Sequence, residues 1–217
     1  MIIAHRGYWD KYIPENSMTA FIRCVERNIP IELDVHLTKD NKVVVFHDYD
    51  LFRMSGVSKR IEETNDEELQ KYNLKKSYEK IPLLEDVLKI VNNKILVLIE
   101  LKNRKVGPLE NKVLKITEKY FNCYFQSFNL KSVYYLKART DKKVGLLVMN
   151  KISKKLSNSK KIDFIAQNLL TIEFSKTKKE LFAFTIDNDR ELDKALKYTD
   201  SMIANISKLD LHNLNKL

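Results

Sequence analysis

The sequence is poor in the residues that would indicate anything other than an ordinary globular fold. Only two of its 217 residues are cysteine, and Cys24 and Cys123 do not form a metal-type pair, so we expect free, buried thiols. No run of apolar residues approaches the length of a membrane-spanning helix. Glycine occurs only four times, so a glycine inside a motif is informative. The 44% of hydrophobic and 31% of charged residues are typical of a soluble globular protein.

Acidic residues are in the minority, and the formal net charge is +10. The lysines are spread along the chain and do not form the clustered basic stripe, interleaved with aromatic residues, that is typical of nucleic-acid binders. We therefore expect a solvated surface with some attraction to anionic substrates or membranes, a small-molecule substrate and no nucleic-acid partner. The densest basic cluster, residues 151–161, is interpreted as a solubility feature. Because His5 and Arg6 leave no room for a signal peptide before them, we expect a cytoplasmic protein.

Residues 31–48, IELDVHLTKDNKVVVFHD, organise the rest of the chain. The first half alternates as a strand does, with Ile31, Leu33 and Val35 on one side. Glu32 and Asp34 lie on the other side. Burying unpaired carboxylates costs several kcal/mol each. A bound cation is the leading way to offset that cost.

A hairpin should follow this strand. Residues 39–42, KDNK, have the Asp/Asn chemistry of a tight turn, and residues 43–46 form a mainly β-branched run that ends in His47 and Asp48. If the hairpin closes at this turn, His47 lies beside Asp34, and a histidine next to an acidic metal cradle is suited to catalysis. His36 shares the face of the two acids but is expected to be solvated in the hairpin.

The order of the elements predicts an α/β fold. Residues 2–4 form a short strand, a helix begins at Asn16 or Ser17, and residues 31–35 form the next strand, which implies parallel strands with a right-handed crossover. Outside the hairpin we count about eight βα units, the number that closes a TIM barrel. We predict a single (β/α)8 domain over residues 1–217, with a small hairpin-containing insertion at about residues 36–80. Residues 169–180 are ambiguous because they alternate like a strand where the topology requires a helix.

The functional site of such a barrel lies at the C-terminal ends of its strands. The polar residues that fall there are His5 and Arg6 from the first strand, Glu32 and Asp34 from the second, His47 from the hairpin, and Glu100 and Lys102 from the third. Three carboxylates without a thiolate favour a hard cation such as Mg²⁺ or Ca²⁺. Arginine can grip phosphate oxygens, and two histidines can act as acid and base. The set describes metal-assisted cleavage of a phosphate ester.

Each of these residues also has an ordinary structural interpretation. A histidine at a strand end is more often structural than catalytic, and Glu100 with Lys102 could be an ion pair on the barrel rim. The two acids of the second strand could lie at an open sheet edge. Convergence weakens these alternatives, because one fold brings all the unusual polar residues together. His212, in the polar tail, is expected to be a surface residue.

The same residues lie in motifs that resemble those of the glycerophosphodiester phosphodiesterase family, in order along nearly the whole chain. Residues 5–7 are similar to the family's HRG, 14–17 to PENT, 32–35 to ELDV, 38–40 to a T-x-D turn and 44–48 to VV-x-HD. Residues 81–85 resemble IPTLEE, 99–102 the E-x-K strand and 127–128 an SF pair. The combination is highly specific, although any single motif is weak.

This resemblance implies a TIM barrel of the phospholipase-C-like type that hydrolyses glycerophosphodiesters to glycerol 3-phosphate and an alcohol with one divalent cation. Matched motif by motif, Glu32, Asp34 and Glu100 would be the metal ligands. His5 and His47 would be the acid–base pair, and Arg6 and Lys102 would bind the phosphate. Glu15 and Asn16 would support the site.

Departures from the family pattern lie in the C-terminal half. The family's WTVN is replaced by FTID at residues 184–187, and its glycine-containing ending before the last strand by YTDS at residues 198–201. These changes leave the metal and histidine positions untouched, so they concern substrate fit and not the reaction type.

Two other functions remain open from the sequence. A lysophospholipase D, whose diester retains one acyl chain, would need an apolar groove at the barrel mouth, which Tyr8, Trp9 and Phe52 could form. A non-catalytic barrel that binds phosphodiesters as a sensor or scaffold is disfavoured by the intact set of acids and histidines.

Overall fold

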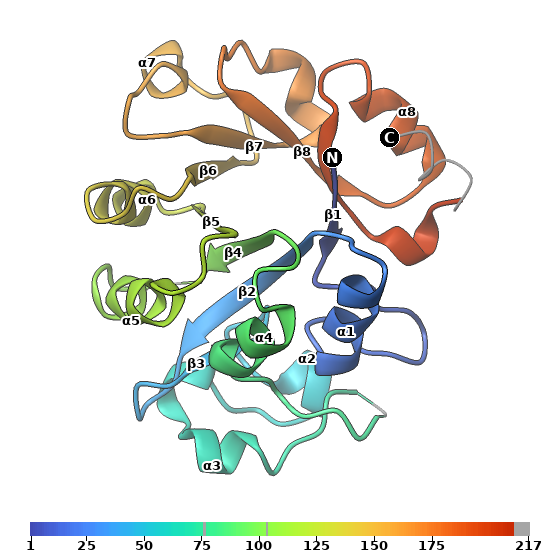
Figure 1. Cartoon of the computed structure of the whole chain (residues 1–217), viewed down its shortest axis with the longest axis vertical. Coiled ribbons are helices and arrows are strands. Elements are labelled where there is room, and N and C mark those ends of the chain that lie inside the picture. Colours follow the sequence, from blue (N-terminus) through green and yellow to red (C-terminus); the bar gives the residue numbers. More distant parts are fainter. Residues whose placement is uncertain (76, 103, 211–217) are drawn as a thin grey trace.

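The computed structural model describes residues 1–75, 77–102 and 104–210 (Figure 1). The strands are β1 (Ile2–His5), β2 (Ile31–Leu37), β3 (Val43–Val45), β4 (Val97–Leu101), β5 (Cys123–Ser127), β6 (Val144–Val148), β7 (Phe164–Asn168), β8 (Glu180–Ile186) and β9 (Ser201–Ala204). The α-helices are α1 (Met18–Glu26), α2 (Phe52–Ser55), α3 (Asp66–Leu69), α4 (Leu84–Val91), α5 (Pro108–Thr117), α6 (Leu130–Lys137), α7 (Lys154–Ser157) and α8 (Asp189–Ala195). Short 3₁₀ helices are η1 (Ile61–Glu63), η2 (Leu169–Phe174) and η3 (Ile206–Lys208).

The strands close into a parallel barrel. Their order is β1-β9-β8-β7-β6-β5-β4-β2-β3, and β1 also pairs with β2. All neighbours are parallel except β3, which pairs antiparallel with β2 outside the ring. The eight parallel strands of the described residues therefore form a closed barrel with helices around it, and the predicted TIM barrel is confirmed (Figure 1).

The alternation of β2 divides its side chains between two layers. Ile31, Leu33 and Val35 are fully buried in the layer between the strands and the outer helices. Glu32 and Asp34 point the other way, into the barrel interior, as the period of two requires.

The deeper part of the barrel interior is packed with apolar side chains. Phe164 and Phe182 meet edge to face there, with ring centroids 4.9 Å apart. Gly145 on β6 provides the space for one of these rings, because a Cβ atom at this position would lie 2.0 Å from the Phe164 ring. The polar layer toward the C-terminal ends of the strands therefore rests on a filled core and not on a channel.

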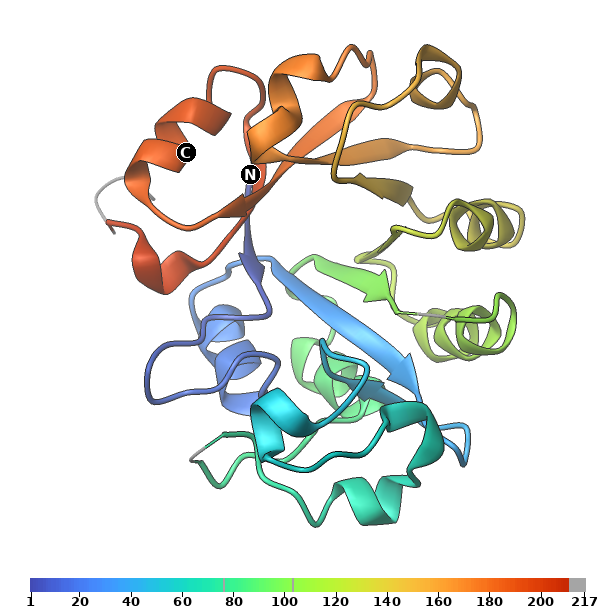
Figure 2. The same cartoon turned by 180° about the vertical axis from the view of Figure 1, so that it is seen from behind.

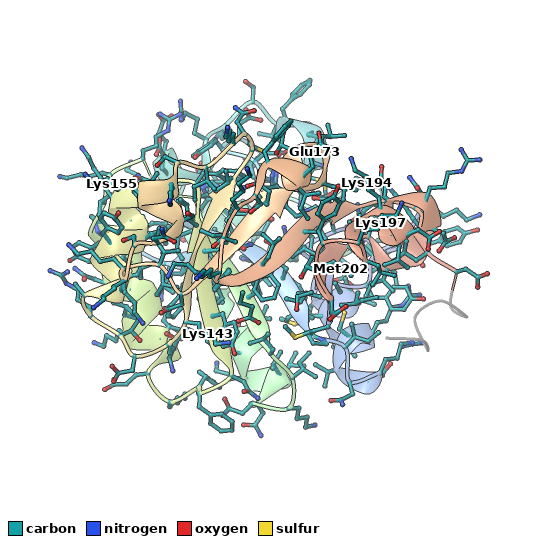
Figure 3. All side chains as sticks on the ribbon, turned by 90° about the horizontal axis from the view of Figure 1, so that it is seen from above. Lys143, Lys155, Glu173, Lys194, Lys197 and Met202 are labelled. Atoms are coloured by element: carbon teal, nitrogen blue, oxygen red, sulfur yellow. The ribbon has the colours of Figure 1, made fainter. Side chains whose placement is uncertain are left out.

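The ends of the barrel can be followed in the positions of three side chains. Lys155 and Glu173 follow β6 and β7, and both lie at the end opposite Lys143, which precedes β6 (Figure 3). The polar strand ends predicted to form the site are thus at the same end of the barrel as Lys155 and Glu173.

The outer helices follow the predicted apolar spacing. Ser17 caps α1 by accepting a hydrogen bond from the Ala20 backbone N–H at 3.3 Å, which decides between the two expected caps. Four apolar residues of α4 at helical spacing are buried: Leu84, Val87, Leu88 and Val91.

The second half of the barrel has weaker helical coverage. The ambiguous segment after β7 forms the 3₁₀ helix η2, in which the three-residue spacing buries Leu169 and Ile172 on one side. The only helix of the described residues between β6 and β7 is α7, which has four residues.

The segment between β3 and α4 has a hydrophobic core of its own, although its sequence looks polar and irregular. The fully or almost fully buried residues of this core are Val44, Phe46, Leu51, Met54, Ile61, Leu69, Leu74 and Ile81. The segment, coloured cyan to green, covers one end of the molecule beyond β2 (Figure 2). Met54 of α2 belongs to this core, which anchors α2 within the segment.

Cys24 and Cys123 are free and buried, as expected from the sequence. None of the described helices combines the length and apolar character that crossing a bilayer requires.

Candidate active site

Three carboxylates meet at the C-terminal end of the barrel interior. Glu32 and Asp34 project from β2 and Glu100 from β4, and each offers one oxygen atom within 4.8 Å of the others. The register of the parallel strands creates this cluster, because Asp34 pairs directly with Glu100. None of the three residues is more than 6% exposed.

Two cationic side chains border the cluster. Arg6 Nε lies 3.4 Å from Asp34 Oδ2, and the Arg6 backbone N–H donates to Glu32 Oε2 at 3.2 Å. Lys102 Nζ lies 3.1 Å from Asp34 Oδ1 and 2.5 Å from Glu100 Oε1. The ion pair of Glu100 with Lys102 therefore exists, but it lies within the cluster and not on the outer rim.

The charges of the cluster are unevenly balanced. Burial, together with the Asp34 carboxylate, raises the pKa of Glu100 to about 7. Burial and the two neighbouring carboxylates also raise the pKa of Glu32 well above its usual value. Burial alone would raise the pKa of Asp34, but Lys102 and Arg6 hold it below the usual range. Two cations thus leave part of the negative charge uncompensated.

These residues fit a hard divalent cation. They offer carboxylate oxygens and no sulfur, and two amides that touch the cluster have buried oxygens without a hydrogen-bond partner in the described structure. Asn16 Nδ2 donates to Asp34 Oδ2 at 3.0 Å, and Gln126 Nε2 donates to Glu32 Oε1 at 3.3 Å. The free amide oxygens of Asn16 and Gln126 are further hard donors beside the carboxylates.

His5 is the last residue of β1 and is held by the other end of the chain. Its Nδ1 lies 2.9 Å from Asn205 Oδ1, and Asn205 Nδ2 donates in turn to Asp187 Oδ1 at 2.5 Å. Because the amide oxygen accepts, the His5 proton is on Nδ1 and Nε2 remains available in the pocket. Burial, followed by the charge of Arg6, lowers the pKa of His5 to about 4, so the ring is neutral at pH 7.

His47 follows β3 and is held by a carboxylate. Its Nδ1 lies 2.6 Å from Asp48 Oδ1, so Nδ1 carries the proton and Nε2 is again the available nitrogen. Burial lowers the pKa of His47, against the opposing effect of Asp34. The Phe46 backbone N–H donates to the Asp34 carbonyl oxygen at 2.9 Å, which brings the returning hairpin back beside Asp34 as predicted.

The loop after β1 supports the site from one side. Gly7 has φ +81°, and a Cβ atom there would lie 3.0 Å from the Ala20 side chain, so the loop needs glycine at this position. Glu15 Oε1 accepts a hydrogen bond from Arg6 Nη1 at 2.7 Å. Glu15 therefore orients Arg6, and Asn16, the next residue, contacts the acidic cluster.

Arg53 on α2 links the two sides of the site. Its Nε donates to Asp48 Oδ2 and its Nη2 to Glu15 Oε1, both at 2.6 Å. One guanidinium thus joins the carboxylate behind His47 to the carboxylate behind Arg6.

Both histidines open into one pocket of about 120 Å³. Its polar lining includes His5, Arg6, Glu32, His47, Glu100, Lys102 and Gln126, and its apolar lining Phe128, Leu147, Phe184 and Ile203. Phe184, one of the departures from the family pattern, meets Phe128 edge to face with centroids 6.1 Å apart. The apolar wall therefore comes from the second half of the barrel, and Tyr8, Trp9 and Phe52 are not among the lining residues.

Sequence reasoning missed several residues of this site. Gln126 lies in β5 and Asn205 directly after β9, so the strand-end rule would have found both. Arg53 has no such signal, because its role depends on the folded segment between β3 and α4.

The expectation for His36 was wrong. This residue belongs to β2 and is 3% exposed, and its Nε2 donates to the His47 carbonyl oxygen at 3.2 Å. The Tyr49 ring packs against it edge on, because the segment after β3 covers this end of the strand. His212 lies outside the described residues.

Comparison with known proteins agrees with this geometry. The model of the glycerophosphoryl diester phosphodiesterase family matches residues 5–199. YhdW of Bacillus subtilis, provisionally named a glycerophosphodiester phosphodiesterase, is 35% identical over 87% of each chain. The glycerophosphodiester phosphodiesterase of Caldanaerobacter subterraneus is 35% identical over 68% of this chain and 66% of its own length.

Solved structures show the same fold. A phosphodiesterase of Oleispira antarctica, in complex with the product sn-glycerol-3-phosphate, superposes with a TM-score of 0.83 at 20% identity over 94% of this chain and 92% of that chain. The glycerophosphodiester phosphodiesterase of Thermotoga maritima gives a TM-score of 0.75 at 28% identity over 94% and 93%. The chain belongs to the glycerophosphoryl diester phosphodiesterase family.

Proposed function

We propose that this protein hydrolyses glycerophosphodiesters to glycerol 3-phosphate and an alcohol, with one divalent cation, Mg²⁺ or Ca²⁺, held by Glu32, Asp34 and Glu100. The observation that carries the proposal is a single pocket lined by two imidazoles, each fixed through Nδ1, and by Glu32 and Glu100 of the buried carboxylate cluster. The names of the two relatives given above support the substrate class.

The phosphate group would lie between Arg6 and Lys102. Both cations line the pocket, and both already face carboxylates, so their positions are fixed before substrate arrives. When bound, the divalent cation would supply Lewis-acid polarisation of the phosphate and neutralise developing negative charge.

The two histidines are suited to opposite roles. His5, which is neutral and held by an amide, would take the proton from the attacking oxygen through Nε2. His47, which is held by the Asp48 carboxylate, is assigned as the proton donor to the leaving oxygen, because Asp34 and Asp48 oppose the burial that lowers its pKa.

The apolar pocket wall keeps a lysophospholipase D activity as a second candidate. Phe128 is 47% exposed at the pocket, where an acyl-bearing glycerol could contact it. Lysophospholipase D GDPD1 of Homo sapiens is 34% identical over 54% of this chain and 41% of its own length, which also favours this alternative.

A direct assay tests the proposal and separates the two candidates. The purified chain is incubated with glycerophosphocholine or lysophosphatidylcholine in saturating Mg²⁺ or Ca²⁺, and glycerol 3-phosphate and lysophosphatidic acid are measured. We expect glycerol 3-phosphate from the deacylated diester to be the faster product. Faster release of lysophosphatidic acid would favour the second candidate, and binding of both diesters without turnover would indicate a non-catalytic barrel.

Arg53 provides a second prediction, because it positions His47 only through Asp48. We expect Arg53→Ala to reduce kcat by about tenfold, since the lost bond to Asp48 orients the imidazole. KM should change little, because Glu15 loses its bond to Arg53 but keeps its own bond to Arg6. Arg53→Lys should recover part of the loss. Arg60→Ala is the matched control, because Arg60 lies in the same segment and pairs with Glu62. An increase in KM alone would contradict this role.

A further inference from the structure

We infer that a second anion-binding pocket adjoins the active site and takes a negatively charged group carried by the leaving alcohol. This inference rests on the proposed function. The pocket encloses about 270 Å³ between the C-terminal ends of β2 and β4. Its charged lining residues are Lys39, Glu62, Lys102, Arg104 and Lys105.

The pocket shares one lining side chain with the active site. Lys102 lines both cavities, so the lysine proposed to hold the scissile phosphate also borders the second pocket. A leaving alcohol on the Lys102 side of the scissile phosphate would therefore extend toward the second pocket.

The lining carries an excess of positive charge. Its one acidic residue, Glu62, already pairs with Arg104 at 3.1 Å and with Arg60 at 3.0 Å. Lys39 and Lys105 are exposed, and neither has a carboxylate partner in the part of the chain that the structure describes. Their charges remain available to an incoming anion.

Two further features favour an anion at this place. The Arg104 guanidinium lies over the Tyr49 ring, 5.3 Å from its centroid, and this contact restricts the side chain. Pro108, the first residue of the ten-residue helix α5, lines the pocket, so the positive end of the helix dipole points toward it.

This chemistry selects one class of substrate. A cationic alcohol such as choline would be repelled, and a neutral polyol would gain nothing from the charges. A leaving alcohol that carries a second phosphate would place this phosphate among the unpaired lysines. The concave shape and volume suit one such group better than the flat surface of a membrane.

A matched pair of substrates tests the inference. Glycerophosphoinositol and glycerophosphoinositol 4-phosphate differ by one phosphate on the leaving alcohol. We expect kcat/KM to be about five- to tenfold higher for the phosphorylated substrate at low salt, and the difference to shrink as ionic strength rises. The double variant Lys39→Ala/Lys105→Ala should remove the preference and leave turnover of glycerophosphoinositol within about twofold.

The control is a pair of lysines elsewhere on the surface. The double variant Lys194→Ala/Lys197→Ala, at the end of α8 and just after it, removes the same net charge from the segment between β8 and β9 (Figure 3). Neither lysine lines either pocket. Equal kcat/KM for the two substrates, or loss of the preference in the control as well, would overturn the inference.

Inorganic phosphate identifies the source of the anion. Free phosphate could alter glycerophosphoinositol turnover in the original chain but not in the Lys39→Ala/Lys105→Ala variant, while both diesters react at equal rates. In that case the pocket takes a free anion, and the assignment to the leaving alcohol is wrong. Absence of turnover with either diester and with glycerophosphocholine would instead overturn the proposed function.

Discussion

His47→Ala is expected to reduce turnover of glycerophosphodiesters by about 10²–10⁴-fold, and His5→Ala by a similar factor, because each removes one of the two proton-transferring groups. Both side chains line the pocket and neither is part of the main apolar core, so the fold should remain intact. The measurement is kcat with glycerophosphocholine, accompanied by a thermal unfolding curve for each variant. Near-normal activity in either variant would defeat the mechanism.

The nature of the leaving group distinguishes the two roles. An activated diester with a nitrophenol leaving group needs no protonation of the departing oxygen. His47→Ala should therefore recover much of its activity on such a substrate, whereas His5→Ala should not, since His5 acts on the attacking oxygen. Lys89→Ala is the control, because Lys89 lies at the surface of α4, pairs with Asp86 and does not line the active-site pocket. Recovery by His5→Ala instead of His47→Ala would reverse the assignment.

Removal of divalent cations is expected to have the second large effect. Treatment with EDTA should lower turnover by at least about 10²-fold, and Mg²⁺ or Ca²⁺ should restore it, because stabilisation of the phosphate charge by a cation contributes several kcal/mol. Glu100→Gln should weaken the binding of the added cation. Glu118→Gln, at the surface end of α5, is the control. Full activity in EDTA would contradict the proposal.

Thermal stability provides a readout that does not depend on activity. A cation that binds only the folded chain stabilises it by about 2.7 kcal/mol at a concentration of 100 Kd, which should raise Tm measurably. Without the cation, the pKa of Glu100 is about 7 in the folded chain and 4.5 in the unfolded chain, so the folded chain binds this proton more tightly. Its contribution to stability therefore declines as pH rises from 4.5 to 7.

Binding of the cation requires deprotonated carboxylates, so the cation-induced increase in Tm should grow over this same pH range. A Tm that is insensitive to Mg²⁺ and Ca²⁺ at every pH would show that the cluster binds neither ion.

The sequence alone determined the barrel and the residues at its strand ends. A period of two on β2 separates two inward acids from three outward apolar residues, and this separation does not depend on distant parts of the chain. Because parallel strands in a barrel end at one face, residues that are far apart in sequence, such as His5 and Glu100, could be assigned to one site.

Tertiary structure alone decided which groups support these residues. Asn205 holds His5 across 200 positions of sequence, and Arg53 joins two carboxylates from separate loops. His36 is buried and not solvated because a segment with its own apolar core folds over the end of β2. Such contacts depend on how loops pack against the barrel, and loop packing leaves no periodic pattern in the sequence.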